Sequence, residues 1–249
     1  MSQSTFGKKF TVTTWGESHG KALGTVVDGV PAGLFLTEAD IQTYLDRRKP
    51  GQSRYTTARN EGDEVEILSG IFEGQTTGTP ISMIVRNKDQ RSRDYGNIAQ
   101  TYRPGHADFG FDSKYGFRDY RGGGRSSGRE TIGRVAAGAI AAKILKELGI
   151  TLQAYTRSIG PVSCHSYHPE VIKENSFYMP DMVAAEKASQ YLEQCMKEED
   201  SAGGVIECRI NGVPAGIGDP VFGKLDAAFA QALMSIGAVK AVGIGDGIK

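Results

Sequence analysis

The sequence has 249 residues, of which 39% are hydrophobic and 23% are charged, and this composition excludes a disordered chain. Its 29 basic and 29 acidic residues give a net charge of zero, which argues against DNA or another nucleic acid as the partner. No apolar run approaches the ~18 residues of a membrane span and no signal-peptide pattern follows the first methionine, so we expect no membrane partner.

The first part of the chain combines short strands with one helix. Runs of β-forming residues predict four strands, at 9–15, 24–28, 65–68 and 81–85. A helix is predicted to begin after Thr37, where the pattern resembles a capping box. It should end at about Arg48, because Pro50 and Gly51 stop a helix.

The segment from 89 to 128 is rich in Arg, Tyr, Gly, Asp and His and has no helical or strand period. A long irregular segment in a compact domain is usually either functional or disordered. Its many aromatic residues argue against disorder, so we interpret it as functional.

The rest of the chain is predicted to be mainly helical. The best helix spans 129–148, where small and apolar residues recur at helical spacing and Gly149 ends the pattern. Two further helices are predicted at 183–197 and 220–235. One strand is predicted at 205–210, and a strand-like run follows at 239–244.

Residues 25–33 and 208–216 resemble each other. In each, a predicted strand leads into the same Gly-Val-Pro-Ala-Gly turn, and a helix follows shortly. A true repeat would give two similar strand–turn–helix units. The fold class is then α+β, with helices packed on antiparallel or mixed sheets, and we expect a single domain over 1–249.

Arginines are concentrated in one part of the chain, because 13 of the 15 fall between Arg47 and Arg134. Arginine holds phosphate and carboxylate groups through two hydrogen bonds at once. We therefore favour a site for a small, highly charged anion. The alternative for any single arginine is an ordinary surface ion pair with a nearby acid.

The three cysteines, Cys164, Cys195 and Cys208, show neither a metal-ligand spacing nor a disulfide framework. We expect a cytoplasmic protein without a metal site.

The segment Gly16-Glu-Ser-His-Gly20 follows a predicted strand and matches the G-x-S-x-G pattern of serine hydrolases. That pattern requires a helix directly after the second glycine, whereas a turn and a strand are predicted here. A hydrolase that uses Ser18 is therefore the weaker interpretation. The stronger one keeps Ser18 as a hydrogen-bond donor and His19 as a proton donor.

Two further segments carry chemistry. Arg103-Pro-Gly-His-Ala-Asp108 places His106 on a loop, where a histidine can exchange protons near neutral pH. The run from Asp119 to Thr131 combines three glycines, two serines and three arginines before the best helix. Free backbone amides, cationic side chains and a helix N-terminus together favour anion binding. The run is neither a P-loop nor a dinucleotide-binding fingerprint.

These three segments resemble the hallmark motifs of the chorismate synthase family. Six shorter segments agree with the same family, at 46–51, 53–56, 69–74, 77–80, 89–92 and 232–235. The resemblance extends over nearly the whole chain, from about Phe6 to Gly247.

The resemblance implies an enzyme that converts 5-enolpyruvylshikimate-3-phosphate to chorismate by anti-1,4-elimination of phosphate, the last step of the shikimate pathway. It implies a requirement for reduced FMN without net redox change, and in some members reduction of the flavin by NADPH. It further implies a β-α-β sandwich with an internal repeat, assembled into homotetramers.

The resemblance also implies roles for particular residues. His19 would protonate the departing phosphate, and His106 would donate a proton near the flavin. The substrate anions would be bound by one serine and three arginines, Ser18, Arg48, Arg54 and Arg103, and two of these, Arg48 and Arg54, are also placed at the NADP site. The FMN-binding residues would be Arg125, Ser126, Ser127, Gly237 and Ala238.

Members of the family usually run on past the point where this chain stops at Lys249, and their later part contains an Arg-His-Asp-Pro-like motif that is absent here. We therefore expect a C-terminally truncated or incomplete family member. An inactive flavin- or anion-binding fragment is the main alternative to an active enzyme.

Overall fold

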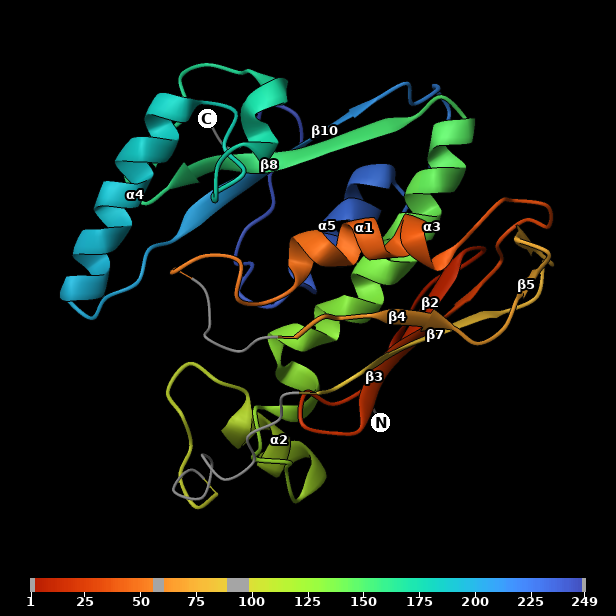
Figure 1. The fold of residues 1–249 in the computed structure, drawn as a ribbon, viewed down its shortest axis with the longest axis horizontal. Helices are drawn as coiled ribbons and strands as arrows, with labels where there is room; N and C mark the ends of the chain where they lie inside the picture. The colour runs from red at the N-terminus through yellow and green to blue at the C-terminus, as the bar shows by residue number, and fades with distance from the viewer. Residues whose placement is uncertain (1–2, 56–60, 89–98, 248–249) are drawn as a thin grey trace. The chain divides into compact units, whose positions relative to one another are not determined.

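The computed structural model describes residues 3–55, 61–88 and 99–247. The motif at 89–92 and three of the clustered arginines, Arg59, Arg91 and Arg93, lie outside these ranges. The chain divides into two compact units (Figure 1). Unit 1 comprises Met1–Lys49, Arg59–Ile144 and Pro214–Lys249, and unit 2 comprises Pro50–Ala58 and Leu145–Val213. The single domain over 1–249 stays a prediction.

Unit 1 contains a five-stranded sheet in which every neighbouring pair is antiparallel. In spatial order its strands are β1 (Thr5–Gly7), β2 (Thr11–Gly16), β3 (Ala22–Asp28), β7 (Ile81–Arg86) and β4 (Val65–Ile67). A small hairpin pairs β5 (Ile71–Phe72) with β6 (Gln75–Thr76). The apolar side chains of β7 alternate between buried and partly buried, as the period of two in a strand requires.

The helices of unit 1 are α1 (Glu38–Arg48), α2 (Asp108–Tyr115), α3 (Thr131–Glu147) and α5 (Leu225–Met234). Two 3₁₀ turns, Gly124–Ser126 and Gly128–Glu130, lead into α3. The predicted capping box opens α1, because the Asp40 carboxylate accepts a hydrogen bond from the Thr37 amide at 2.9 Å.

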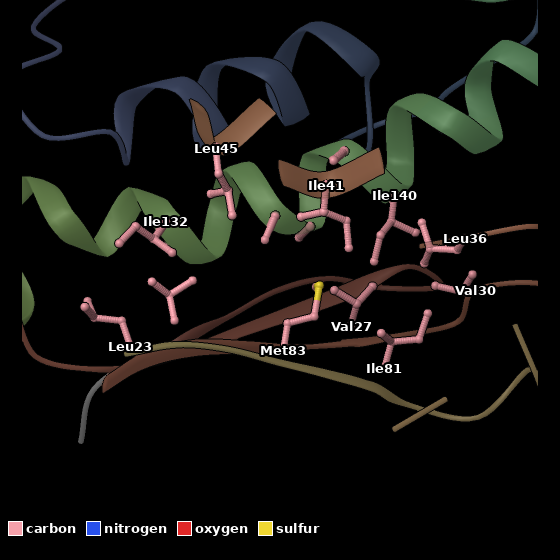
Figure 2. Close-up of a cluster of buried hydrophobic side chains, with 14 of the residues drawn as sticks. Leu23, Val27, Val30, Leu36, Ile41, Leu45, Ile81, Met83, Ile132 and Ile140 are labelled. Atoms are coloured by element: carbon pink, nitrogen blue, oxygen red, sulfur yellow. The ribbon is translucent and has the colours of Figure 1, made fainter. Parts of the chain in front are cut away.

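The core of unit 1 lies between the sheet and the helices α1 and α3. Figure 2 shows aliphatic side chains of both helices pointing at those of β3 and β7, among them Ile41, Leu45, Ile132, Ile140, Leu23, Val27, Ile81 and Met83. Burial of each such side chain contributes about 1.5–3 kcal/mol to folding. α3 approaches the sheet closely at Gly133, where a Cβ would lie 2.8 Å from Thr14 Cγ2.

Unit 2 contains a three-stranded antiparallel sheet in the order β10 (Gly204–Asn211), β8 (Thr151–Ile159) and β9 (Val162–Ser163). Its main helix is α4 (Met182–Lys197), preceded by a 3₁₀ turn at Pro169–Lys173. Asp181 caps α4 by accepting from the Ala184 amide at 3.1 Å. Burial alone would raise the pKa of Asp181, but hydrogen bonds from backbone amides hold it well below its usual range.

Most predicted elements are confirmed within one to three residues at each end. Five strands were not predicted, namely β1, β5, β6, β9 and the nine-residue β8. The structure also differs in three further places. It forms α2 inside the predicted irregular segment, α5 begins at Leu225 and not at 220, and 239–244 forms no strand. The apolar pattern could not reveal α2, because Asp108 is its one buried residue. No helix within the described ranges is long and apolar enough to cross a membrane.

Both Gly-Val-Pro-Ala-Gly turns use glycine at the same two places. Gly29 follows β3 and Gly212 follows β10, and both have φ of +81°. An added Cβ would lie 1.7 Å from the Lys9 carbonyl oxygen at Gly29 and 2.2 Å from the Gly149 carbonyl oxygen at Gly212. Each turn therefore presses a glycine against the residues that precede the neighbouring strand.

Gly29→Ala is expected to lower the free energy of unfolding by on the order of 3 kcal/mol, because both the positive φ and the carbonyl overlap oppose a side chain. Gly33→Ala in the same turn is the control. It shares a positive φ of +86°, but its Cβ would meet no atom of the described residues within 4 Å, so it should cost only about 1–2 kcal/mol. Urea unfolding measures both values, and equal losses would contradict a role for the carbonyl contact.

Candidate functional site

The turn Glu17–Gly20 follows β2 and carries Ser18 and His19. Both side chains are buried, at 1% and 7% exposure, although serine and histidine usually lie nearer the surface. Ser18 Oγ lies 3.1 Å from His19 Nδ1 and donates to the Gly122 carbonyl oxygen at 3.3 Å. These contacts hold the imidazole ring against the glycine-rich run, 104 residues further along the chain.

The run contains three consecutive glycines, and Gly122 lies directly against the Ser18–His19 turn. Gly122, Gly123 and Gly124 all have positive φ values, of +62°, +86° and +55°. A Cβ on Gly122 would lie 2.2 Å from both Cε1 and Nδ1 of His19, and one on Gly123 would lie 3.6 Å from Arg103 Nη2. A side chain at Gly122 would displace the histidine, whereas the positive φ values favour glycine at all three positions.

Two predicted anion-binding regions contain arginine–carboxylate pairs. Arg103 donates through Nε and Nη2 to both oxygens of Asp108, each at 2.9 Å. Arg121 forms the same two-bond contact with Asp119, at 2.8 and 2.9 Å. The Arg121 guanidinium holds the pKa of Asp119 below its usual range, with a smaller contribution from nearby His19. The two ion pairs therefore hold the guanidinium groups of Arg103 and Arg121 in fixed orientations beside the glycine-rich run.

The Arg103–Asp108 pair should make stability depend on pH. The Arg103 guanidinium lowers the pKa of Asp108 to about 2, whereas it is about 3.9 in an unfolded chain. A lowered pKa stabilises the fold above about pH 4, and this contribution of about 2 kcal/mol is lost as the pH falls towards 2.

Asp108→Asn should therefore lower the urea-unfolding free energy by about 2 kcal/mol at pH 7, and by less at pH 3. A loss that is equal at both pH values would show that the charge of Asp108 is not the cause.

Arg125 lies at the end of β2. Its Nη1 donates to the Gly16 carbonyl at 3.1 Å, and its Nη2 donates to Thr14 Oγ1 at 2.7 Å. Ser126 is exposed and donates to the Gly123 carbonyl, and the Ser127 hydroxyl accepts from the Arg129 amide. The Arg125 guanidinium also forms a longer ion pair with Glu130, at 3.8 Å.

The turn at Gly237–Ala238 is tied to the same region through α3. Arg134 donates to Glu130 at 2.8 Å and to the hydroxyl and carbonyl oxygens of Ser235, at 2.6 and 3.1 Å. A Cβ on Gly237 would meet no atom within 4 Å among the described residues. The turn is exposed at this position.

Arg48 leads to a buried ion cluster that the sequence analysis missed. Its Nη2 lies 3.2 Å from Asp63 Oδ2, and Arg129 Nη1 donates to Asp63 Oδ1 at 2.9 Å. The Asp63 side chain is completely buried. No local pattern marks Asp63, because its partners lie 15 and 66 residues away and their contact depends on the tertiary fold.

Two predicted site residues, His106 and Arg54, are exposed and make contacts with other parts of the chain. His106 is exposed on the loop before α2, where its Nδ1 lies 3.0 Å from the Pro104 carbonyl and its amide donates to Arg103. Arg54 belongs to unit 2 and forms an exposed ion pair with Glu193 on α4. The other candidates all belong to unit 1.

The alternatives can be compared with this geometry. After Ser18 the chain turns directly into β3, so the helix of a hydrolase nucleophile elbow is missing at this position. Within the described ranges, no group of three or more His, Cys, Asp or Glu side chains could hold a metal ion. The described residues combine a buried histidine, a close glycine backbone and arginines held by carboxylates.

Comparison with known proteins identifies related chains. The family model described as chorismate synthase matches residues 10–249. The chain is 67% identical to the chorismate synthase of Agathobacter rectalis over 99% of its own length and 68% of the relative's. It is 63% identical to the enzyme of Lachnoclostridium phytofermentans, covering 100% of this chain and 68% of the relative. A solved structure titled "Crystal Structure of Chorismate Synthase" superposes with a TM-score of 0.79 at 33% identity, over 96% of this chain and 70% of that one.

Proposed function

Because the chain belongs to the chorismate synthase family, we propose that unit 1 carries the anion-binding and proton-transfer part of a chorismate synthase active site. The function is that of a chorismate synthase, a carbon–oxygen lyase of the shikimate pathway (EC 4.2.3.5). The proposed reaction is anti-1,4-elimination of phosphate from 5-enolpyruvylshikimate-3-phosphate. The single observation that carries the site is the contact of Gly122 with the buried Ser18–His19 pair.

The substrate carries one phosphate and two carboxylates, and the arginines of unit 1 suit these groups. We assign Arg48 and Arg103, together with Ser18, to substrate binding. Asp63 and Asp108 hold the two guanidinium groups in fixed orientations, which reduces the entropy lost when an anion binds. Arg54 in unit 2 is proposed as a further contact of the substrate or of NADP.

His19 is the proposed acid for the departing phosphate. Ser18 contacts Nδ1 and the Gly122 backbone limits ring rotation, so the imidazole is held in one orientation. A histidine titrates near neutral pH and can protonate a leaving phosphate oxygen. His106 is proposed as the second proton donor, placed next to Arg103 by its backbone hydrogen bond.

The residues assigned to FMN suit an anionic cofactor with hydrogen-bonding groups. Arg125 supplies a fixed cation, Ser126 and Ser127 supply hydroxyls, and Gly237 and Ala238 supply an open backbone turn. Reduced FMN, when bound, would supply transient electron density that eases loss of a weakly acidic hydrogen. Arg125 and Ser127 would bind and orient it, and NADPH is the proposed reductant.

The internal repeat of the fold and the oligomeric state are further parts of the proposal. The matched glycines of the two Gly-Val-Pro-Ala-Gly turns support an internal repeat of strand–turn–helix units within a β-α-β sandwich. We also propose a cytoplasmic homotetramer without nucleic-acid or membrane partners, and light scattering of the purified chain measures its mass. The chain spans about two thirds of the length of the curated relatives it matches.

The function is tested by anaerobic chorismate formation from 5-enolpyruvylshikimate-3-phosphate with chemically reduced FMN. Turnover by the 249-residue chain supports the proposal. Binding of substrate or flavin by the folded chain without turnover would favour the alternative, an inactive fragment that binds anions. Cleavage of activated esters that depends on Ser18 and not on flavin would favour the hydrolase.

A further inference from the structure

Asn87 lies directly after β7 and contacts the turn that carries Ser18 and His19. Its Nδ2 donates to the Glu17 carbonyl at 3.0 Å and to the Gly20 carbonyl at 2.8 Å. These two carbonyls flank Ser18 and His19 on either side. The Gly20 amide also donates to Glu17 at 3.1 Å, so the turn is closed once by its own backbone and once by Asn87.

The orientation of the Asn87 amide is determined by the chemistry of its partners. Its Oδ1 accepts from Arg129 Nε at 3.2 Å and from Arg129 Nη2 at 2.9 Å. A guanidinium can only donate and a backbone carbonyl can only accept. Rotating the amide by 180° would therefore oppose donor to donor and acceptor to acceptor at all four contacts. The Asn87 backbone is fixed as well, because its amide donates to Lys21 at 3.2 Å.

Beyond Asn87 the contacts continue into the buried ion cluster. Arg129, only 6% exposed, donates to Asp63, and Asp63 also contacts Arg48. One chain of polar contacts thus joins the Ser18–His19 turn to Arg48. Movement at one end would leave buried donors or acceptors unpaired, which opposes such movement.

We propose that Asn87 is a positioning residue, which orients the Ser18–His19 turn and ties it through Arg129 and Asp63 to Arg48. The inference rests on the proposed roles of His19 as the proton donor and of Arg48 as a substrate contact. Asn87 touches none of the reacting atoms in this assignment. It acts through the backbone carbonyls of Glu17 and Gly20.

The test is Asn87→Asp, which preserves the shape of the side chain and its acceptors for Arg129 but places an oxygen against two carbonyls. Asn175→Asp in unit 2 is the matched control. Asn175 Nδ2 also donates to two carbonyls, of Val171 and Met179, at 3.0 and 2.8 Å, and it holds a loop without assigned site residues.

Two readouts separate positioning from simple stability. The first is kcat and KM for chorismate formation, where Asn87→Asp is expected to lower kcat about 10²-fold. The second is the NMR signal of the His19 ring Cε1–H. Among the signals of the four histidines of the chain, it is the one that disappears in His19→Ala. We expect Asn87→Asp to shift this signal, and Asn175→Asp to leave both kcat and the signal unchanged.

An unshifted His19 signal, or a similar loss of kcat in Asn175→Asp, would overturn the proposal. If the chain shows no turnover at all, the proposed function fails in this assay, but the NMR comparison still decides the role of Asn87. A shifted His19 signal in Asn87→Asp alone then supports positioning without any activity measurement.

Discussion

His19→Ala is expected to lower kcat for chorismate formation by about 10²–10⁴-fold, which is the usual contribution of a positioned proton donor. The alanine variant can neither protonate the departing phosphate nor fill the space beside Gly122. Because substrate binding is assigned mainly to arginines, KM should change much less than kcat. Anaerobic turnover with chemically reduced FMN measures both constants.

His168→Ala is the control for this experiment. His168 is exposed on unit 2 and lies 3.4 Å from Glu170, so its removal should leave kcat within about twofold of the original value. Far-UV circular dichroism of both variants would confirm that the fold is retained. A folded His19→Ala variant with nearly full turnover would rule out His19 as the acid.

Gly122→Ala is expected to have the second largest effect, about a 10²-fold loss of kcat, because a displacement of about 1 Å at a reacting group has that cost. A methyl group here would lie 2.2 Å from the His19 ring and 2.8 Å from Ser18 Oγ, and φ of +62° disfavours any side chain. The His19 ring must therefore move. Turnover and the His19 ring NMR signal measure the two effects.

Gly128→Ala is the matched control in the same glycine-rich run. Its Cβ would meet no atom within 4 Å among the described residues, and its φ is outside the left-handed region. Turnover and the His19 signal should therefore stay unchanged in Gly128→Ala. Equal losses of turnover in the two variants would indicate that flexibility of the run matters, and not contact with His19.

The proposed anion site is not a set of bare cations. Arg103 pairs with Asp108, Arg121 with Asp119, and Arg48 and Arg129 share Asp63. The ion-pair interpretation is confirmed for these arginines, and the anion site stays a prediction. Removing one member of a buried pair leaves an unpaired charge and typically costs about 3–5 kcal/mol. The carboxylates of Asp63, Asp108 and Asp119 are therefore part of the proposed anion site, although the number of arginines in the sequence does not reveal them.

Local patterns predicted many parts of the fold correctly. The capping box at Thr37 appears where expected, and α4 and the long helix α3 follow their apolar periods. The run at 239–244 shows why such patterns fail elsewhere. β-forming residues make a stable strand only when another strand supplies hydrogen bonds, and these residues have no such partner within the described ranges. The reverse failure is α2, which forms without an apolar stripe.

The sequence by itself determined the family, the candidate histidines and the glycine-rich run, because motif residues and their order can be read along the chain. Only the tertiary structure decided which of them meet. Ser18 contacts Gly122 across 104 residues, and Arg134 reaches Ser235 across 101. Asn87 and Asp63 were not found from the sequence, because a side chain that acts by bridging distant carbonyls and guanidinium groups has no local pattern. Burial and hydrogen-bond partners are properties of packing, and packing depends on contacts between segments that spacing along the chain does not encode.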